Sequence, residues 1–235
     1  MKRIGIVGGM GPEGSLYYYR LLVELSRGTQ SSGRKYPEIE MLIYNLNQNK
    51  FINMSDSSSW VEFTAKLVNA IQGLYRGGAD FALIACNTAH VVFDDVKAKS
   101  PIPLLSIVEE ACKAVARLRL AKVGLFGSRI TMQGHFYQDV FRKNNISIVV
   151  PREEEQVYIH SKNREEIVLG ILRDETRAGF LEIARRMIEE ESIQGLIIAC
   201  TEMPLLLTKD ELGIPFFDTS KIHAQSAFSY SLSET

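Results

Sequence analysis

Cysteine is scarce in this sequence, and none of its cysteines is paired at the spacing of a zinc or redox motif. Only three occur in 235 residues, Cys86, Cys112 and Cys200, and none belongs to a C-x-x-C pair. An odd number of widely spaced cysteines does not suggest a disulfide framework, and the absence of paired ligands argues against a zinc site. We therefore expect no metal, and a reducing compartment, most simply the cytoplasm.

Long apolar runs and blocks of like charge are also missing. No stretch approaches the roughly 18 apolar residues of a membrane-spanning helix, and the N-terminal MKRIGIVGG lacks the apolar core of a signal peptide. The formal net charge is −1, without a block of like charges. These features argue against a membrane or a nucleic acid as the main partner. The apolar fraction of 46% is enough for a sizeable core.

Short apolar runs alternate with longer helical patterns along the chain. The apolar runs predict eight strands, at Arg3–Val7, Glu40–Tyr44, Phe81–Ala85, Leu104–Ile107, Val123–Phe126, Ser147–Val150, Leu196–Ala199 and Phe216–Phe217. The segments between them predict helices at Ser15–Ser26, Ser59–Arg76, Glu109–Arg119, Met132–Lys143, Arg164–Glu175 and Gly179–Glu190. This alternation is typical of an α/β fold with parallel strands and helices on both faces of each sheet. Ligands of such sheets bind beyond the carboxyl ends of the strands, so the residues that follow each strand are candidate site residues.

The chain also contains two copies of one pattern. RIGIVGGMGP, from Arg3, resembles KVGLFGSRIT, from Lys122, and ADFALIACNTAH, from Ala79, resembles IQGLIIACTEMP, from Ile193. The two pairs are separated by nearly the same number of residues. We therefore expect two similar lobes, each a mostly parallel sheet flanked by helices, related by a pseudo-twofold axis. Residues 1–108 with 218–235 would form the first lobe, and residues 109–217 the second.

Two of the cysteines stand where such a fold places ligand-binding residues. Cys86 and Cys200 each follow an apolar strand and precede amide, hydroxyl or carboxyl side chains. If the two lobes share one cleft, one thiolate can remove a proton from a carbon while the other thiol protonates the opposite face. Packing as small hydrophobic residues, or redox pairing, are the alternatives for these two cysteines. Cys112 lies in the helical pattern EEACKAVARL, and we expect it to serve packing.

The glycine-rich stretch IGIVGGMGPEGS matches a dinucleotide-binding fingerprint only in part. Gly9, Gly11 and Gly14 spell G-x-G-x-x-G. A dinucleotide site normally has an acidic residue at the end of the second strand, but residues 44–47 here read YNLN. Pro12 also removes one backbone donor from the turn. The stretch therefore favours a smaller anion, such as a carboxylate, over a nicotinamide or flavin nucleotide.

Four motifs are spread along nearly the whole chain: GGMGPEGS, ACNTAH, ACTEMPLLL and FDTSKIHAQSA. Together they resemble the aspartate/glutamate racemase family, and most closely its aspartate racemase branch. The resemblance implies a cofactor-independent racemase of two pseudo-symmetric α/β lobes, commonly a homodimer, that acts on a small acidic amino acid. It implies that Cys86 and Cys200 are the two proton-transfer residues. The substrate contacts that it implies are Met10, Gly11, Asn87, Thr88 and Thr201.

Other candidate residues carry alternatives. The resemblance implies two cations for the side-chain carboxylate of the substrate: Lys50, after the second strand, and Arg177, where the family pattern has lysine. Because arginine differs from lysine in reach and hydrogen-bond geometry, aspartate, glutamate and other substrates all stay open. Glu202 either orients Cys200, binds the substrate ammonium, or stabilises a helix N-terminus. His90 and His223 either act near the cleft or pack in the core. A carboxylate-binding protein with inert cysteines is the alternative function.

Overall fold

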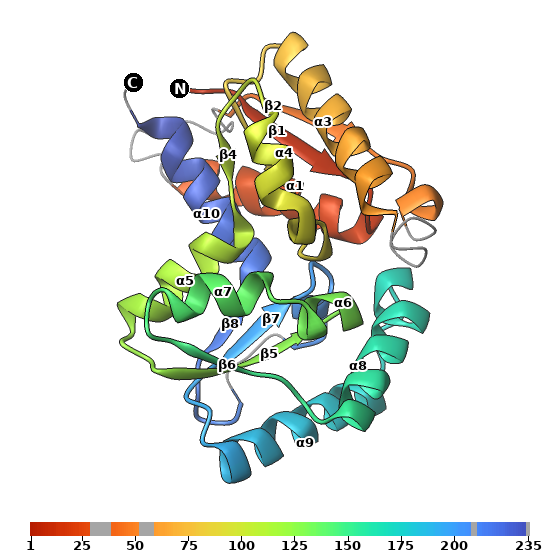
Figure 1. Ribbon diagram of the computed structural model, residues 1–235, viewed down its shortest axis with the longest axis vertical. Helices are drawn as coiled ribbons and strands as arrows, with labels where there is room; N and C mark the ends of the chain where they lie inside the picture. The colour runs from red at the N-terminus through yellow and green to blue at the C-terminus, as the bar shows by residue number, and fades with distance from the viewer. Residues whose placement is uncertain (29–38, 52–58, 208–210, 234–235) are drawn as a thin grey trace. The chain divides into compact units, whose positions relative to one another are not determined.

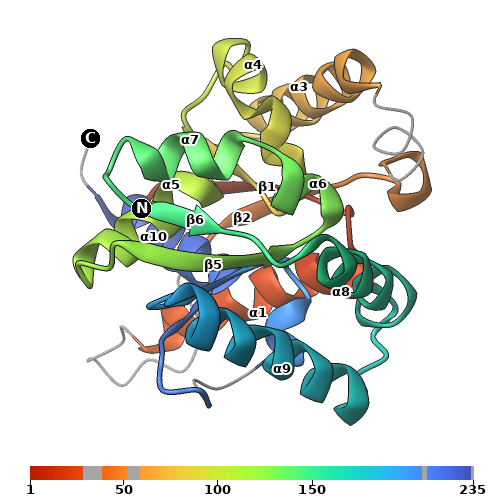
Figure 2. The same ribbon diagram turned by 60° about the horizontal axis from the view of Figure 1, so that its bottom comes forward.

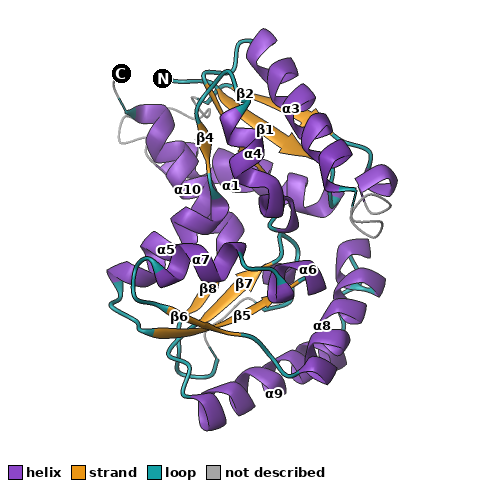
Figure 3. Ribbon diagram, in the orientation of Figure 1, coloured by secondary structure: helices purple, strands orange, loops and turns teal. Residues whose placement is uncertain are grey.

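The computed structural model describes residues 1–28, 39–51, 59–207 and 211–233, and they divide into two compact units. Unit 1 consists of Met1–Ile107 and His223–Thr235, and unit 2 of Val108–Ile222. Each unit contains one sheet of four parallel strands with helices packed against it (Figures 1 and 3). The α/β fold class with two similar lobes is thereby confirmed.

The sheet of unit 1 has its first and third strands at the centre. Its strand order is β2 (Met41–Asn45), β1 (Ile4–Gly8), β3 (Phe81–Ile84) and β4 (Leu104–Leu105). Among its described residues, its helices include α1 (Pro12–Gly28), α3 (Trp60–Arg76), the 3-10 helix η1 (Thr88–Val92), α4 (Phe93–Ala98) and most of α10 (Thr219–Leu232). Because helices cover both faces, β1 and β3 are buried throughout, which explains their continuous apolar sequences.

The two faces of this sheet carry separate apolar clusters. Ile4 and Ile6 pack with residues of α1 and α10 on one face. Val7, Ile84 and Cys86 belong to the cluster on the other face, which includes α3 and α4. The alternation of strand side chains between opposite faces therefore assigns Cys86 to the side of the sheet covered by α3.

The sheet of unit 2 repeats the strand order of unit 1. Its order is β6 (Ser147–Val149), β5 (Lys122–Gly127), β7 (Leu196–Ala199) and β8 (Phe216–Asp218). Its helices are α5 (Ile107–Arg117), α6 (Arg129–Gln133), α7 (Phe136–Arg142), α8 (Glu153–Glu165), α9 (Asp174–Glu191) and the 3-10 helices η2 (Ile167–Leu169) and η3 (Met203–Leu205). Figure 2 shows α8 and α9 on one side of the sheet and α7 on the other. Cys86 and Cys200 therefore follow the same strand of two sheets with one topology.

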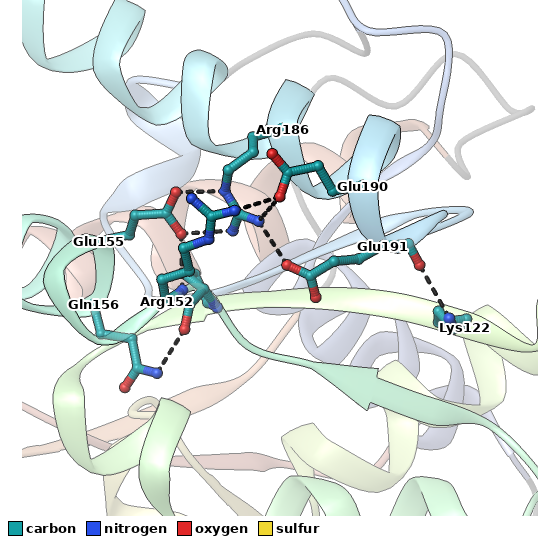
Figure 4. A network of polar contacts seen from close by, with 8 residues as sticks. Lys122, Arg152, Glu155, Gln156, Arg186, Glu190 and Glu191 are labelled. Atoms are coloured by element: carbon teal, nitrogen blue, oxygen red, sulfur yellow. Dashed lines mark hydrogen bonds and ion pairs between the residues drawn. The ribbon is translucent and has the colours of Figure 1, made fainter.

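Charged side chains connect α8 to α9. Arg186 of α9 donates from Nε and Nη2 to the two carboxylate oxygens of Glu155 on α8, at 2.6 Å each. The same guanidinium contacts Glu191 at 2.7 Å and Glu190 at 3.3 Å (Figure 4). Arg152, which precedes α8, also binds Glu190. At the other end of α8, the Glu166 carboxylate accepts hydrogen bonds from Lys162 and from Thr176 of α9.

Two of the predicted helices are wrong in extent. Arg164–Glu175 is not one helix, because α8 ends at Glu165 and Gly170 adopts a left-handed backbone, with φ of 75°, before α9 begins at Asp174. Met132–Lys143 is divided between α6 and α7 at Gly134, whose backbone is extended. Among the helices with bounds given above, α4, α8 and α10 are additional to those predicted. All eight predicted strands are present, with small differences at their ends.

Candidate functional site

The glycine-rich turn of unit 1 is shaped by close packing of the backbone. Gly9 has φ of 80°, and a Cβ atom there would lie 2.2 Å from the carbonyl oxygen of Leu46. The Gly9 N–H donates to Ser15 Oγ at 2.8 Å, so this donor is already used within the protein. Pro12 is the first residue of α1. These contacts give Gly9 a structural reason that does not require a nucleotide.

The Cys86 turn follows β3 beside the glycine turn. Val7 and Ile84 are register partners in the parallel pair of β1 and β3, so both turns begin at the carboxyl edge of adjacent strands. Of the predicted contacts, the buried residues Met10 and Gly11 follow β1, while Asn87 and Thr88 follow Cys86 directly. Cys86 is 8% exposed. The fold thus brings these five candidate residues to one edge of the sheet of unit 1.

His90 fixes the backbone of the Cys86 turn. Its Nε2 accepts a hydrogen bond from the Ile107 N–H at 3.2 Å, so Nδ1 carries the proton and donates to the Cys86 carbonyl at 2.9 Å. Burial, followed by the nearby His223, lowers the pKa of His90 to about 3. Neutral His90 therefore holds the turn in place through the carbonyl oxygen of Cys86, and both of its ring nitrogens bind backbone groups.

His223 is likewise occupied by the fold. Its Nε2 lies 3.1 Å from the Leu105 carbonyl, which requires a proton on Nε2, and its Nδ1 then accepts from the Tyr18 hydroxyl at 2.9 Å. Burial lowers the pKa of His223 to about 4. The packing alternative for this histidine agrees with its contacts, because both ring nitrogens are used in unit 1.

Lys50 lies at a pocket beside the carboxyl end of β2. The pocket has a volume of about 290 Å³ and is lined by residues of the β2 end and α3, namely Tyr44, Asn45, Leu46, Asn47, Lys50, Phe51, Phe63, Lys66 and Asn69. Lys66 is paired with Glu62 at 2.9 Å. Lys50 is exposed. Neither Cys86 nor Asn87 lines this pocket, so the structure does not bring Lys50 together with them there.

In unit 2, the Cys200 thiol lies between two oxygen acceptors. Sγ is 3.0 Å from Oδ1 of Asn163 and 3.4 Å from Oε2 of Glu202. Thr201 donates from its hydroxyl to the same Glu202 oxygen at 2.6 Å. All four side chains are buried. The carboxyl end of β7 thus holds a compact polar cluster around the sulfur.

Electrostatics keep the Cys200 thiol protonated. Burial is the largest effect, followed by the negative charge of Glu202, and together they raise the pKa of the thiol well above its usual value. The backbone N–H groups of Glu202 and Met203 donate to the sulfur and act in the opposite direction. The contact of Glu202 with Cys200 is compatible with an orienting role, one of the three roles considered for it. Burial also raises the pKa of Cys112, which lies in α5 with 2% exposure.

Arg177 stands in the first turn of α9 and forms an ion pair with Glu211. Its guanidinium is therefore already bound to a carboxylate of the protein. The residue that sequence reasoning missed is Asn163, in the last turn of α8. The segment EEEQVYIHSKNRE is strongly polar, and nothing in its pattern indicated that one amide would reach a cysteine 37 positions away.

The described residues, 1–28, 39–51, 59–207 and 211–233, also bear on two other kinds of feature, a metal site and a membrane-spanning helix. Among those residues, no group of three or more histidine, cysteine, aspartate or glutamate side chains is arranged to hold a metal ion. Within the same ranges, no helix is both long and apolar enough to cross a membrane.

Comparison with known proteins agrees with this geometry. Residues 7–227 match the Asp/Glu/Hydantoin racemase family. The broad specificity amino-acid racemase RacX of Bacillus subtilis is 24% identical over 228 residues, 96% of either chain. Glutamate racemase of Mycobacterium leprae is 30% identical over 151 residues, 62% of this chain and 52% of that protein. An aspartate racemase homologue from Pyrococcus horikoshii OT3 has a similar structure, with a TM-score of 0.85, 32% identity and coverage of 99% of this chain and 100% of the other. The chain belongs to the Asp/Glu/Hydantoin racemase family.

Proposed function

We propose that this protein racemises a small acidic amino acid, aspartate or glutamate, without a cofactor, and that Cys86 and Cys200 transfer the protons. The observation that carries the proposal is the pair of equivalent cysteine turns, each at the carboxyl end of the third strand of a sheet with one topology. Membership of the racemase family supports the reaction type.

In the proposed reaction, one thiolate takes the α-proton and forms a new S–H bond. The electron pair of the broken C–H bond moves into the substrate carboxylate, which becomes enediolate-like. The second thiol then gives its proton to the opposite face of the carbon, and its S–H electrons remain on sulfur as a thiolate. Burial and the charge of Glu202 raise the pKa of Cys200, which favours its thiol form at rest. Racemisation in both directions then requires each cysteine to act as acid and as base in turn.

The residues around each cysteine have complementary roles in this proposal. Asn87, Thr88 and Thr201 would hold the substrate, with Met10 and Gly11 beside its α-carboxylate. Lys50 and Arg177 would bind the side-chain carboxylate. Since Arg177 is paired with Glu211, an acidic substrate has to replace Glu211 at the guanidinium. We also propose that the protein is a cytoplasmic homodimer. Analytical ultracentrifugation of the purified protein tests whether it is a dimer.

A wider substrate range is the second candidate. It is favoured by the likeness to a broad specificity racemase over nearly the full length of both chains and by the ion pair that occupies Arg177. Chiral chromatography should therefore include L- and D-aspartate, glutamate, alanine, lysine and arginine, without added cofactor. Conversion confined to aspartate or glutamate supports the acidic assignment, and faster conversion of a neutral or basic amino acid rejects it.

Deuterium incorporation separates an enzyme from a carboxylate-binding protein. In heavy water, a racemase replaces the substrate α-hydrogen with deuterium, and nuclear magnetic resonance follows this loss of signal. A binding protein with inert cysteines would bind aspartate or glutamate in calorimetry and leave the α-hydrogen in place. That second result would remove the racemase proposal for these substrates.

A further inference from the structure

We propose that Asn163 is a positioning residue for Cys200, and that its amide serves both protonation states of the sulfur. The carboxamide accepts a hydrogen bond from the thiol and, after rotation about its last side-chain bond, donates one to the thiolate. This inference rests on the proposed function, in which Cys200 has to act as acid and base in turn.

The contact itself is the first argument. Asn163 Oδ1 lies 3.0 Å from Sγ, nearer than the Glu202 carboxylate at 3.4 Å. The asparagine is 7% exposed and the cysteine 8%. Because water is largely excluded from both groups, the sulfur depends on protein partners for its hydrogen bonds.

The chemistry of the groups that contact the sulfur is the second argument. A carboxylate such as Glu202 can only accept, so it repels the thiolate. The backbone N–H groups of Glu202 and Met203 can only donate. A carboxamide presents an acceptor oxygen and a donor nitrogen at nearly the same position. Asn163 is therefore the one partner among these that suits either state of the sulfur.

The anchoring of α8 is the third argument. Asn163 stands in the last turn of this helix, between the Glu155–Arg186 contacts at one end and the Glu166–Thr176 contact at the other. Ile159, one turn earlier, is fully buried. These contacts tie α8 to α9 on both sides of the asparagine and so restrict movement of the helix that carries the amide.

The test measures ionisation of Cys200 directly. In a chain carrying Cys86→Ser and Cys112→Ser, Cys200 is the remaining thiol. Iodoacetamide alkylation across a pH series, with thiolate ultraviolet absorbance as a second readout, gives the midpoint of its ionisation. Asn163→Leu should raise that midpoint by about one pH unit, tenfold less thiolate at a given pH, because charge-assisted hydrogen bonds are the stronger kind. Asn163→Asp should raise it further, since aspartate only accepts and adds a negative charge.

Two companion variants separate this role from a structural one. Gln156→Leu removes another buried amide of α8, which donates to the Pro151 carbonyl at 2.7 Å, and should leave the midpoint unchanged. Asn163→Gln keeps the carboxamide and should return the midpoint to within about half a unit of the parent. An unchanged or lowered midpoint in Asn163→Leu, or a shift in Asn163→Gln as large as that in Asn163→Leu, overturns the proposal.

The pH dependence of racemisation is a second, independent test of the role of Asn163. In the chain with all three cysteines, the high-pH limb of the kcat/KM profile should move by the same amount as the alkylation midpoint. If no substrate is racemised while the midpoint shifts as expected, the proposed function fails and the control of Cys200 by Asn163 stands. If racemisation proceeds and neither readout moves, Asn163 has no role in the ionisation of Cys200.

Discussion

The sulfur atoms of Cys86 and Cys200 are the atoms on which the proposed reaction depends. Each thiol has to give and take a proton, so Cys86→Ala and Cys200→Ala should each lower racemisation at least a hundredfold, within the ~10²–10⁴ range of general acid–base catalysis. Cys112→Ala, which removes a buried sulfur from α5, should keep its activity. Chiral chromatography of all three variants measures the difference, and full two-way turnover by either of the first two contradicts the assignment.

The backbone conformation at Gly9 predicts how a substitution there changes the stability of the protein. An alanine there would have to adopt φ near 80° with its Cβ 2.2 Å from a backbone oxygen. Gly9→Ala should therefore destabilise the protein by about 2–5 kcal/mol, as strained or clashing positions do. The matched control is Gly170→Ala, because Gly170 has φ of 75° with nothing within 4 Å of the added atom. Urea unfolding that gives both variants the same stability would show that the clash is relieved at little cost.

Helices α8 and α9 are joined by a charged network that is partly buried. The Arg186 side chain is 14% exposed and that of Glu155 15%. The hydrogen bonds that Arg186 donates to Glu155 raise the pKa of Arg186 above its usual value, so the guanidinium stays charged. Because Arg186→Met leaves Glu155 partly buried without its cation, we expect a loss of about 2–4 kcal/mol in the free energy of unfolding.

An exposed ion pair provides the comparison for this variant. Arg142 pairs with Asp139 at 3.6 Å, with side-chain exposures of 76% and 56%. Arg142→Met should change the free energy of unfolding by less than about 1 kcal/mol. Thermal and urea unfolding of the two variants at low and high salt measure both effects. If Arg142→Met and Arg186→Met lower the free energy of unfolding equally, the network around Arg186 stabilises the protein no more than an exposed ion pair does.

The strands were predictable from sequence because both faces of each sheet are covered, which requires continuous apolar runs such as Phe81–Ile84. The two cysteine turns followed from the same pattern. Helix α8 could not be predicted, because its sequence is polar and only a few of its residues face the core. The roles of Asn163 and of the Glu211 partner of Arg177 depend on tertiary contacts between residues 34 to 37 positions apart, which no local pattern reports.

The stability of the folded protein should depend on pH through its two buried histidines. Burial lowers the pKa of His90 to about 3 and of His223 to about 4, whereas an unfolded histidine titrates near about 6.5. Between about pH 6.5 and 4, the unfolded chain therefore binds protons that the folded chain does not. The stabilisation is complete above that range and falls as the pH falls, by about 1.4 kcal/mol per pH unit for each histidine.

Urea unfolding at several pH values between 7.5 and 4 measures this dependence. The double variant His90→Gln, His223→Gln should show a smaller slope of the free energy of unfolding against pH. It should also be less stable than the parent at neutral pH. His135→Gln changes an exposed histidine and should leave the slope as it is in the parent protein. A double variant that retains the full slope would mean that other groups cause the acid sensitivity.

The discontinuity of unit 1 has a consequence for biosynthesis. Unit 2 is a single uninterrupted segment, whereas unit 1 needs His223–Thr235 to be complete. Lys2 donates its N–H to the Ser231 carbonyl at 2.8 Å, and Tyr18 bonds to His223. As the polypeptide leaves the ribosome, unit 2 can close on itself first, while the earliest-made sheet waits for a helix translated more than a hundred codons later. A nonsense mutation that removes His223–Thr235 would therefore damage unit 1, whose sheet is synthesised before that of unit 2.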